Sequence, residues 1–288
     1  MNGDALRARL ASGEPVVLPG VFDALSARLA HAAGHDSLFV SGFAVAATLL
    51  GKPDFGYVTQ TEMADVARRV CSAVPGAHVV VDGDTGYGNA LNVIRTVELY
   101  EQAGAAGVFL EDQEWPKKCG HMAGKRVVAR DDWLAKLDAA LDHRDRMFVV
   151  ARTDAIAAVG IDEACERAAA AQQLGVDAVF VEAPENDDHL RAIVDATPGA
   201  VRVANMVEGG RTTLHTPDEL HTLGFDLIVS PLSGLLPATK AMRDAYGALH
   251  EHGTLRDRLD TLTTFDEFGD VIGLPQHYAL EAAYRRDE

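Results

Sequence analysis

Eight short runs of apolar residues, each followed by a helical pattern, constrain the fold of this chain more than any other feature. Continuous apolar runs are typical of strands buried on both faces, as in a parallel sheet, because a half-solvated strand would alternate apolar and polar residues. The sequence therefore predicts eight parallel strands. We expect them at Val16–Gly20, Leu38–Gly42, His78–Asp82, Gly107–Glu111, Met147–Arg152, Ala178–Glu182, Val201–Asn205 and Leu227–Ser230.

Alanine-rich helical patterns lie between these runs. Two examples are Asp162–Leu174, where we expect Asp162 to cap the helix, and Asn92–Ala103. Several patterns end in glycine, the residue that most readily adopts the left-handed conformation just beyond a helix. Eight strand-then-helix units in 288 residues predict a (β/α)8 barrel of the α/β class. A doubly wound open sheet is the alternative, but no G-x-G-x-x-G pattern follows the first strand.

The last part of the chain is longer than the eighth unit of a barrel requires. We expect residues 1–251 to form the barrel. Residues 252–288 carry further helical patterns, and we expect this C-terminal tail to pack on the barrel or on a neighbouring subunit.

The charge and the cysteine content exclude several classes of protein. A net charge of −17 and a pI near 5.0 argue against binding to nucleic acid or to an anionic membrane surface. Three cysteines are a sparse and odd set, unlike a disulfide framework. The sequence shows no signal peptide and no apolar stretch of membrane-spanning length, so we expect a cytoplasmic protein.

Polar or charged residues end six of the eight predicted strands. Barrel enzymes place their reacting groups at the carboxyl ends of the strands, which meet at one mouth. The alternative is that strand ends are simply exposed to solvent. Solvent exposure explains any single polar residue well, but it explains poorly an arginine at the same level as three carboxylates. We therefore expect one polar site, formed by Ser41, Asp82, Glu111, Arg152, Glu182 and Asn205.

A pair of carboxylates follows the third predicted strand. One glycine separates Asp82 from Asp84, and Asp54 and Glu111 can add oxygen ligands, directly or through water. Mg²⁺ prefers such an all-oxygen, carboxylate-rich site, and Mn²⁺ is an expected substitute. A glycine-rich turn with two solvated aspartates is the alternative for the pair alone. The two further carboxylates favour a metal site.

A basic loop with the sequence KKCGH, Lys117–His121, follows the fourth predicted strand. Nearby positive charge favours a thiolate, so the loop favours a lowered thiol pKa and a reactive Cys119. A lone loop cysteine is more often structural, but its dense basic surroundings favour a function. Cys71 and Cys165 lie among apolar residues and are interpreted as ordinary buried thiols. No second Cys or His pair has the spacing of a zinc site.

Arg152 ends the fifth predicted strand and is suited to bidentate binding of a carboxylate. The alternative is an ion pair with Asp154 or with a neighbouring glutamate. Tyr57, Trp115 and Trp133 are interpreted as packing residues.

These motifs resemble the isocitrate lyase/phosphoenolpyruvate mutase superfamily. The matching segments, in chain order, cover nearly the whole predicted barrel, and the segment LEDQEWPKKCGH is typical of its lyases. The segments are PGVFDALSARLAHAAG, SGF, GKPDFGYVT, DGDTGYGN, LEDQEWPKKCGH, ARTDA, VEAP, NMVEGG and SPLSG.

The resemblance implies roles for these residues. Asp82 would hold Mg²⁺ directly, whereas Asp54, Asp84 and Glu111 would act mainly through bound water. Arg152 would bind and polarise an α-keto or α-hydroxy carboxylate unit. The remaining substrate-binding residues would be Ser41, Gly42, Phe43, Gly120, Glu182 and Asn205.

The resemblance also implies an acid/base group and an assembly. Cys119, with His121 and Lys117 nearby, would donate a proton to the enolate left by cleavage of a carbon–carbon bond. The helical tail would be exchanged between subunits of a homotetramer.

Two positions depart from members that cleave tricarboxylates. Leu236 is interpreted as the position of their extra arginine, and Phe39 stands where a tyrosine is frequent. Both changes favour a smaller or more alkylated substrate, as in the subgroup of dimethylmalate lyase and carboxyphosphonoenolpyruvate phosphonomutase.

We therefore expect a Mg²⁺-dependent lyase that cleaves an alkylated malate to pyruvate or another 2-oxoacid plus a smaller acid. The alternatives are phosphorus–carbon bond formation, decarboxylation of oxaloacetate and non-catalytic binding of a dicarboxylate.

Overall fold

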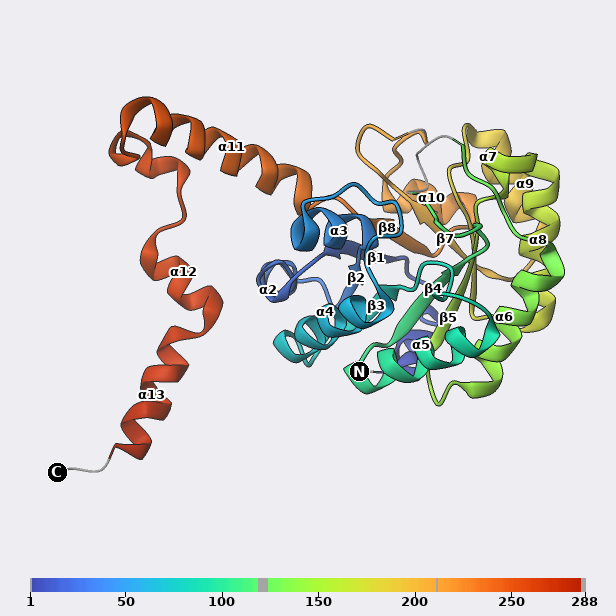
Figure 1. Ribbon diagram of the computed structural model, residues 1–288, viewed down its shortest axis with the longest axis horizontal. Helices are drawn as coiled ribbons and strands as arrows, with labels where there is room; N and C mark the ends of the chain where they lie inside the picture. The colour runs from blue at the N-terminus through green and yellow to red at the C-terminus, as the bar shows by residue number, and fades with distance from the viewer. Residues whose placement is uncertain (1, 119–123, 211, 286–288) are drawn as a thin grey trace.

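A computed structural model describes residues 2–118, 124–210 and 212–285 of the chain (Figure 1). Eight parallel strands form a closed barrel in sequential order, and β1 closes it by pairing with β8 from Val16 opposite Leu227 to Pro19 opposite Ser230. The predicted (β/α)8 barrel is confirmed. The strands are β1 Val16–Val21, β2 Ser37–Val40, β3 His78–Asp82, β4 Gly107–Glu111, β5 Phe148–Thr153, β6 Ala178–Val181, β7 Val201–Asn205 and β8 Leu227–Ser230.

Helices surround this barrel (Figure 1), and α1, Gly3–Leu10, contacts β3 and β5. Its Leu6 and Leu10 join the apolar residues that fill the barrel interior. The other helices before the end of β8 are α2 Ala24–Ala32, α3 Gly42–Leu50, α4 Gln60–Ala73, α5 Ala90–Ala103, α6 Arg130–His143, α7 Ala155–Val159, α8 Ile161–Leu174, α9 Asp187–Ala196 and α10 Pro217–Leu223.

Two predicted helix starts need correction. Helix α8 begins at Ile161, directly after Gly160 with φ 109°, and no side chain caps it, so the prediction of a cap at Asp162 is wrong. Helix α5 begins before the predicted Asn92, because the Asn89 side chain accepts a hydrogen bond from the Leu91 N–H. Both errors arise because a glycine or an asparagine can replace the expected cap within a few residues.

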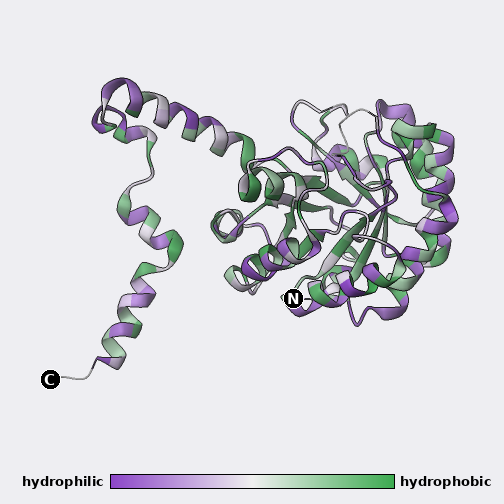
Figure 2. Ribbon diagram, in the orientation of Figure 1, coloured by the Kyte–Doolittle hydropathy of each residue, from purple (hydrophilic) through white to green (hydrophobic). Residues whose placement is uncertain are grey.

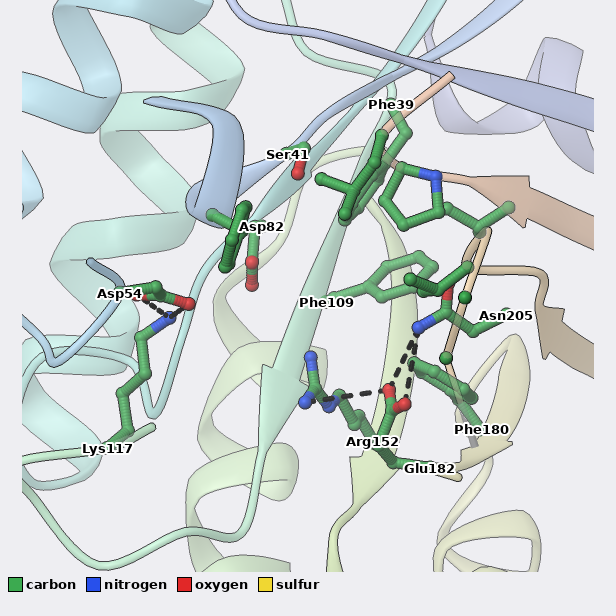
Figure 3. Close-up of a pocket in the computed structure, with 17 residues that line it drawn as sticks. Phe39, Ser41, Asp54, Asp82, Phe109, Lys117, Arg152, Phe180, Glu182 and Asn205 are labelled. Atoms are coloured by element: carbon green, nitrogen blue, oxygen red, sulfur yellow. Dashed lines mark hydrogen bonds and ion pairs between the residues drawn. The ribbon is translucent and has the colours of Figure 1, made fainter. Parts of the chain in front are cut away.

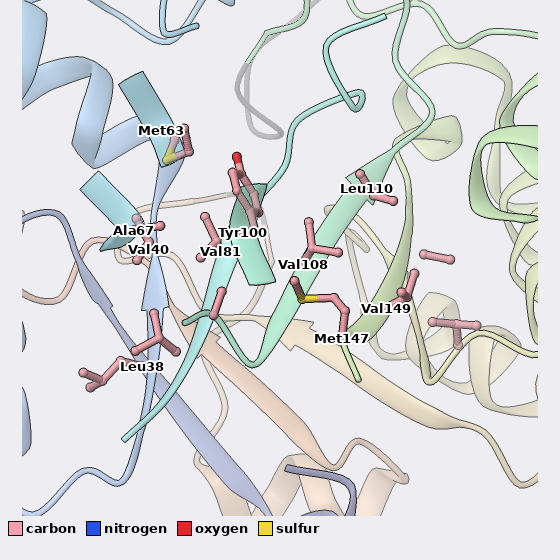
Figure 4. Packing of buried hydrophobic residues seen from close by; sticks show 14 of the residues in the cluster. Leu38, Val40, Met63, Ala67, Val81, Tyr100, Val108, Leu110, Met147 and Val149 are labelled. Atoms are coloured by element: carbon pink, nitrogen blue, oxygen red, sulfur yellow. The ribbon is translucent and has the colours of Figure 1, made fainter. Parts of the chain in front are cut away.

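Successive side chains along each strand point alternately toward the helices and into the barrel, so the core has two regions. Val81, Val108 and Val149 face the helices and pack with residues such as Met63 and Tyr100 (Figure 4). The residues between them point into the barrel and form a second cluster, which includes Leu18, Phe39, Val80, Phe109, Phe148, Val150, Phe180, Val203 and Val229.

Trp133 is fully buried, as predicted for a packing residue, and donates a hydrogen bond to the Leu110 carbonyl at 3.4 Å. Tyr57 and Trp115 are 54% and 48% exposed, so the packing interpretation is wrong for Tyr57. Trp115 lies beside the ring of Tyr87, with a centroid distance of 6.2 Å.

After β8, the chain forms an arm that extends from the barrel (Figure 1). The arm consists of α11 Leu235–His252, a 3-10 helix over Arg256–Thr261, α12 Phe265–Ile272 and α13 Leu274–Tyr284. Hydrophobic and hydrophilic stretches alternate along it (Figure 2). Its α12 contacts α2, where Arg28 donates a hydrogen bond to the Val271 carbonyl at 3.2 Å. No described helix is long and apolar enough to cross a membrane.

Candidate active site

A cavity of about 230 Å³ lies at the carboxyl ends of the barrel strands, as predicted (Figure 3). Of the six polar strand-end residues, Ser41, Asp82, Arg152, Glu182 and Asn205 line it. Glu111 lies just behind them, with its Oε2 3.4 Å from Arg152 Nη2. The other lining residues are Phe39, Phe43, Asp54, Phe109, Lys117, Phe180, Val207, Gly209, Gly210, Val229, Pro231 and Leu232.

Helix α3 points its N-terminus toward one side of this cavity. Ser41 caps the helix by accepting a hydrogen bond from the Ala44 N–H at 3.4 Å. A Cβ at Gly42 would lie 2.6 Å from Asp82 Oδ2, so glycine allows the first turn to approach this carboxylate closely. Phe43 lines the cavity beside Ser41. The N–H groups of a first helical turn have no partner within the helix, so they suit a carboxylate ligand.

Lys117 holds two of the predicted metal-site carboxylates together. Its Nζ lies 2.7 Å from Asp54 Oδ1 and 2.6 Å from Asp84 Oδ1, and all three side chains are buried. Burial alone would lower the pKa of Lys117, but Asp84 and Asp54 raise it well above its usual value. Lys117 is therefore a fixed ammonium rather than a proton donor.

The turn after β3 brings Asp84 next to Asp82. Asp84 has φ 48°, and its N–H donates to Asp82 Oδ1 at 3.2 Å. Burial raises the pKa of Asp84 to about 7; Lys117 opposes this, whereas Asp82 and Asp54 add to it. The carboxylates are thus short of positive charge.

Glu111 adds to this shortage. Its Oε1 is buried and has no hydrogen-bond partner among the described residues, and burial raises its pKa well above the usual range although Arg152 opposes the rise. In the described part of the chain, no group of three or more His, Cys, Asp or Glu side chains is already arranged to hold a metal ion. Mg²⁺ keeps several waters, so loosely arranged carboxylates around Asp82 still fit its charge and its chemistry.

Arg152 occupies the opposite side of the cavity from Asp54 (Figure 3). Its Nε and Nη2 donate to Asp154 at 2.9 and 3.1 Å, and Nη2 also lies 3.5 Å from Glu182 Oε2. The predicted alternative for Arg152, an ion pair with Asp154 or a glutamate, is therefore present. Nη1 has no hydrogen bond to any described residue, which leaves it as a donor for a ligand.

Glu182 and Asn205 form the third polar side. The Asn205 amide nitrogen donates to the two Glu182 carboxylate oxygens at 3.2 and 3.3 Å. This contact orients the Asn205 amide across the cavity from Ser41 (Figure 3).

The floor of the cavity is apolar, and of its residues only Phe39 was singled out from the sequence. Phe39, Phe109, Phe180 and Val229 come from the alternate strands β2, β4, β6 and β8. Phe109 packs against Phe39 at a centroid distance of 4.9 Å and against Phe180 at 5.6 Å. Alternate strands contribute one layer of side chains inside such barrels, so this layer closes the cavity toward the core.

Comparison with known proteins identifies this arrangement. A model of the phosphoenolpyruvate phosphomutase family matches residues 6–250. The chain belongs to this family.

Several relatives of this chain carry the names of enzymes. The chloroplastic carboxyvinyl-carboxyphosphonate phosphorylmutase of Arabidopsis thaliana is 48% identical over 93% of the chain and 80% of the relative. The 2,3-dimethylmalate lyase of Eubacterium barkeri is 42% identical over 97% of the chain and 96% of the relative. The predicted resemblance is confirmed, and the protein is an enzyme of a superfamily that includes named lyases.

Solved structures of family relatives agree. A 2,3-dimethylmalate lyase, described as a PEP mutase/isocitrate lyase superfamily member, matches with a TM-score of 0.92 and 35% identity over 98% of this chain and 94% of that chain. An oxaloacetate acetylhydrolase in complex with 3,3-difluorooxalacetate also matches with a TM-score of 0.92 and 35% identity, over 98% and 96%. Phosphonopyruvate hydrolase in complex with oxalate and Mg²⁺ matches with a TM-score of 0.88 and 28% identity, covering 99% of each chain.

The remaining predicted residues of this family member fall in different places. Cys119, Gly120 and His121 lie outside the described residues, so their predicted roles stay predictions. Cys71 and Cys165 are half-buried free thiols, not fully buried ones.

The segment after β8 also differs from the sequence-based interpretation. Leu232 lines the cavity in the described structure, whereas Leu236 is 42% exposed on α11 and does not line it. The apolar lining that we expected from position 236 is supplied by Leu232, four residues earlier, in the turn before α11.

A second buried cation lies near the site and was not predicted from the sequence. Lys125 Nζ lies 2.7 Å from Asp154 Oδ1, and both side chains are buried. Its only sequence signal is its position shortly after the KKCGH loop.

Proposed function

We propose that this enzyme cleaves the carbon–carbon bond of an alkylated malate, such as 2,3-dimethylmalate, to give pyruvate or another 2-oxoacid plus a smaller acid. The proposal rests on a cavity that combines a polar rim with an apolar floor. Its rim offers Arg152, Asn205 and the α3 N-terminus to carboxylates, whereas its phenylalanine floor suits alkyl substituents. The 42% identity to a 2,3-dimethylmalate lyase supports this substrate class.

The carboxylate cluster would hold Mg²⁺, with Mn²⁺ as a substitute. Asp82 would bind the ion directly, and Asp54, Asp84 and Glu111 would act mainly through water. When bound, the ion supplies a Lewis acid that stabilises negative charge on an enolate oxygen. The buried and crowded carboxylates of this cluster support the assignment.

Backbone and side-chain groups of the protein would bind and orient the substrate. The backbone at Ser41, Gly42 and Phe43 would bind one carboxylate, and Arg152 would bind and polarise the unit that becomes the 2-oxoacid. Donors aimed at developing charge are a large term in catalysis when water is excluded. Glu182 and Asn205 would complete the polar side. Lys117 would take no part in proton transfer, because Asp54 and Asp84 hold it as an ammonium.

Cys119 would donate a proton to the enolate, helped by His121, and Gly120 would allow the loop to approach the substrate. Lys117 would favour the Cys119 thiolate less than its position in the sequence implies, because Asp54 and Asp84 already offset its positive charge. The remaining basic neighbours and the requirement to reprotonate an enolate support the role of Cys119.

A phosphonomutase is the second candidate, because the phosphorylmutase of Arabidopsis thaliana is 48% identical to this chain. A phosphonate group can carry two negative charges, so the cations that line the cavity bear on this alternative. Among the described lining residues the cations are Lys117 and Arg152, and Lys117 is already paired with two carboxylates. This charge balance favours the carbon–carbon lyase.

The tail would join subunits into a homotetramer, with residues 252–288 packing on a neighbour. Phe265, Tyr278 and Tyr284 of the tail are 83%, 62% and 83% exposed within one chain. Large apolar side chains gathered on one segment favour burial at an interface. Helix α11 already extends from the barrel (Figure 1), so the exchanged segment would include α11 as well as the predicted tail.

The decisive experiment is a Mg²⁺-dependent screen for release of a 2-oxoacid. The substrates are malate, 2-alkylmalates, 2,3-dimethylmalate, methylisocitrate and oxaloacetate, with carboxyphosphonoenolpyruvate tested separately. We expect the highest kcat/KM on a dialkylated malate. Preferred turnover of oxaloacetate or of the phosphonate would contradict the proposal.

Cys119→Ser separates a lyase from a decarboxylase or a binding protein. General acid/base groups typically contribute about 10²–10⁴-fold in rate. We expect kcat on the best alkylmalate to fall by that order, with little change in KM, because the thiol acts on the transition state. Cys165→Ser is the matched control and should retain full activity. Wild-type turnover by Cys119→Ser would contradict the mechanism.

A further inference from the structure

Two segments enclose the loop that contains residues 119–123. One follows β4 and the other precedes α6, and an antiparallel bridge joins them between Gln113 and Val127. The Glu114 N–H also donates to the Arg126 carbonyl at 2.8 Å. The two ends of the loop are therefore held side by side at the barrel mouth.

Each end of this loop places one lysine among buried carboxylates. Lys117, on the first end, contacts Asp54 and Asp84. Lys125, on the second end, contacts Asp154, and the two side chains are only 1% and 0% exposed. Burying a lysine is costly unless it is paired, so the Lys125 contact defines where this end of the loop lies.

The carboxylate of Asp154 is shared between two cations. Arg152 donates to both carboxylate oxygens of Asp154, from Nε to Oδ2 and from Nη2 to Oδ1. Lys125 Nζ also contacts Oδ1. Burial alone would raise the pKa of Asp154, but Arg152 and Lys125 lower it to about 2. Lys125 therefore offsets part of the Asp154 charge that Arg152 would otherwise meet alone. Glu111 and Glu182 also face this guanidinium, at 3.4 and 3.5 Å from Nη2, so any relief of its negative surroundings matters to a bound anion.

We propose that Lys125 is a positioning residue for Arg152 and acts through the carboxylate of Asp154. With Lys125 present, part of the charge of Asp154 is offset, so Asp154 holds the guanidinium in place through Nε and Nη2 and leaves Nη1 to a ligand. Without Lys125, the full charge of Asp154 falls on Arg152 and weakens its attraction for a bound carboxylate. The inference rests on the proposed role of Arg152 as the carboxylate anchor, and not on the identity of the substrate.

Binding of oxalate in the presence of Mg²⁺ tests this role without turnover. Oxalate is a suitable probe because the related phosphonopyruvate hydrolase binds it together with Mg²⁺. Groups that orient a ligand-binding residue from behind typically contribute about 10–100-fold, as measured for the outer partners of metal ligands. We expect Lys125→Met to raise the oxalate Kd by that order in calorimetry.

Two matched variants control for charge and for the loop. Lys125→Arg keeps the cation and should restore most of the affinity. Arg126→Met removes a cation from the next position, where the side chain is 77% exposed and pairs with Glu114 instead. It should leave the oxalate Kd unchanged. Equal losses in Lys125→Met and Arg126→Met would show a general charge effect and overturn the proposal.

A double-mutant cycle with Asp154→Asn tests the route of the effect. If Lys125 acts through Asp154, adding Lys125→Met to Asp154→Asn should change the Kd very little. A further loss of about tenfold in the double variant would show that Lys125 acts directly through its field, and would overturn the proposal. This comparison remains valid if Lys125→Met alone fails to fold, because the double variant contains no buried carboxylate at position 154.

The outcomes separate this inference from the proposed function. If wild-type protein binds oxalate but cleaves no alkylmalate, only the proposed substrate class fails. An unchanged Kd in Lys125→Met defeats only the role of Lys125. Absence of Mg²⁺-dependent oxalate binding in the wild type would defeat Arg152 as an anchor, and the inference with it.

Discussion

Arg152→Lys is the substitution whose effect the structure defines most closely. Arg152 is 8% exposed, and its Nε and Nη2 are committed to Asp154, which leaves Nη1 to bind a ligand. A lysine at this position keeps the positive charge. Its ammonium is a single point of donation, however, and cannot bind Asp154 in two places while also reaching a ligand. The substitution therefore removes the ligand contact while preserving the net charge.

The expected loss follows from the contact that disappears. A hydrogen bond to a charged group contributes about 1.5–3 kcal/mol. Each 1.36 kcal/mol is a factor of ten, so one such contact corresponds to a loss of about 10- to 150-fold in kcat/KM. If Arg152 polarises the developing 2-oxoacid, the loss should appear mainly in kcat, because the contact strengthens in the transition state.

The assay is release of the 2-oxoacid from the best alkylmalate, measured over a range of substrate and Mg²⁺ concentrations. Arg191→Lys is the matched control, because the side chain of that arginine is 59% exposed and its ion pair is with Asp188 on the same helix. It should change nothing. A loss smaller than about threefold in Arg152→Lys, well below the value of one charged hydrogen bond, would refute the assignment of Arg152 as the carboxylate anchor.

Three further perturbations test the metal, the assembly and the thiols. Asp82→Ala should abolish Mg²⁺ binding in calorimetry and abolish activity, while circular dichroism shows an intact fold; unchanged Mg²⁺ affinity would mean that the site is misassigned. Light scattering should give the mass of a tetramer, and deletion of residues 252–288 should give smaller species; a full-length monomer at micromolar concentration would contradict the assembly. Iodoacetamide at pH 8 should modify Cys119 first, because burial raises the pKa of Cys71 to about 11 and also raises that of Cys165. About one Cys71 thiol in a thousand is then ionised at pH 8, so mass spectrometry showing faster labelling of Cys71 would contradict this order.

The barrel could be predicted from the sequence because its strands are buried on both faces. Continuous apolar runs such as His78–Asp82 carry that signal directly, and the structure places this strand within the predicted bounds. Helix starts were harder to predict, since Gly160 and Asn89 take positions where another residue was expected. Local capping depends on backbone angles that residue types only favour.

The polar site was predictable for a related reason. Carboxyl ends of parallel strands meet at one edge, so strand-end residues such as Asp82 and Asn205 could be assigned to one cavity from their positions alone. Lys125 could not, because it lies in an irregular loop whose path no periodicity reveals. Its partner Asp154 was visible in the sequence only as one alternative partner for Arg152.

The inward face of the barrel links the core to the chemistry. Val80, Val150 and Val203 of the odd-numbered strands point into the apolar interior, and Asp82, Arg152 and Asn205 each follow two residues later. Successive inward positions on a strand are two residues apart, so these polar residues occupy the next layer of the same interior. The phenylalanine layer of β2, β4 and β6 lies between them and the core. The charged groups therefore lie against an apolar layer, where their interactions with a bound anion are stronger than in water.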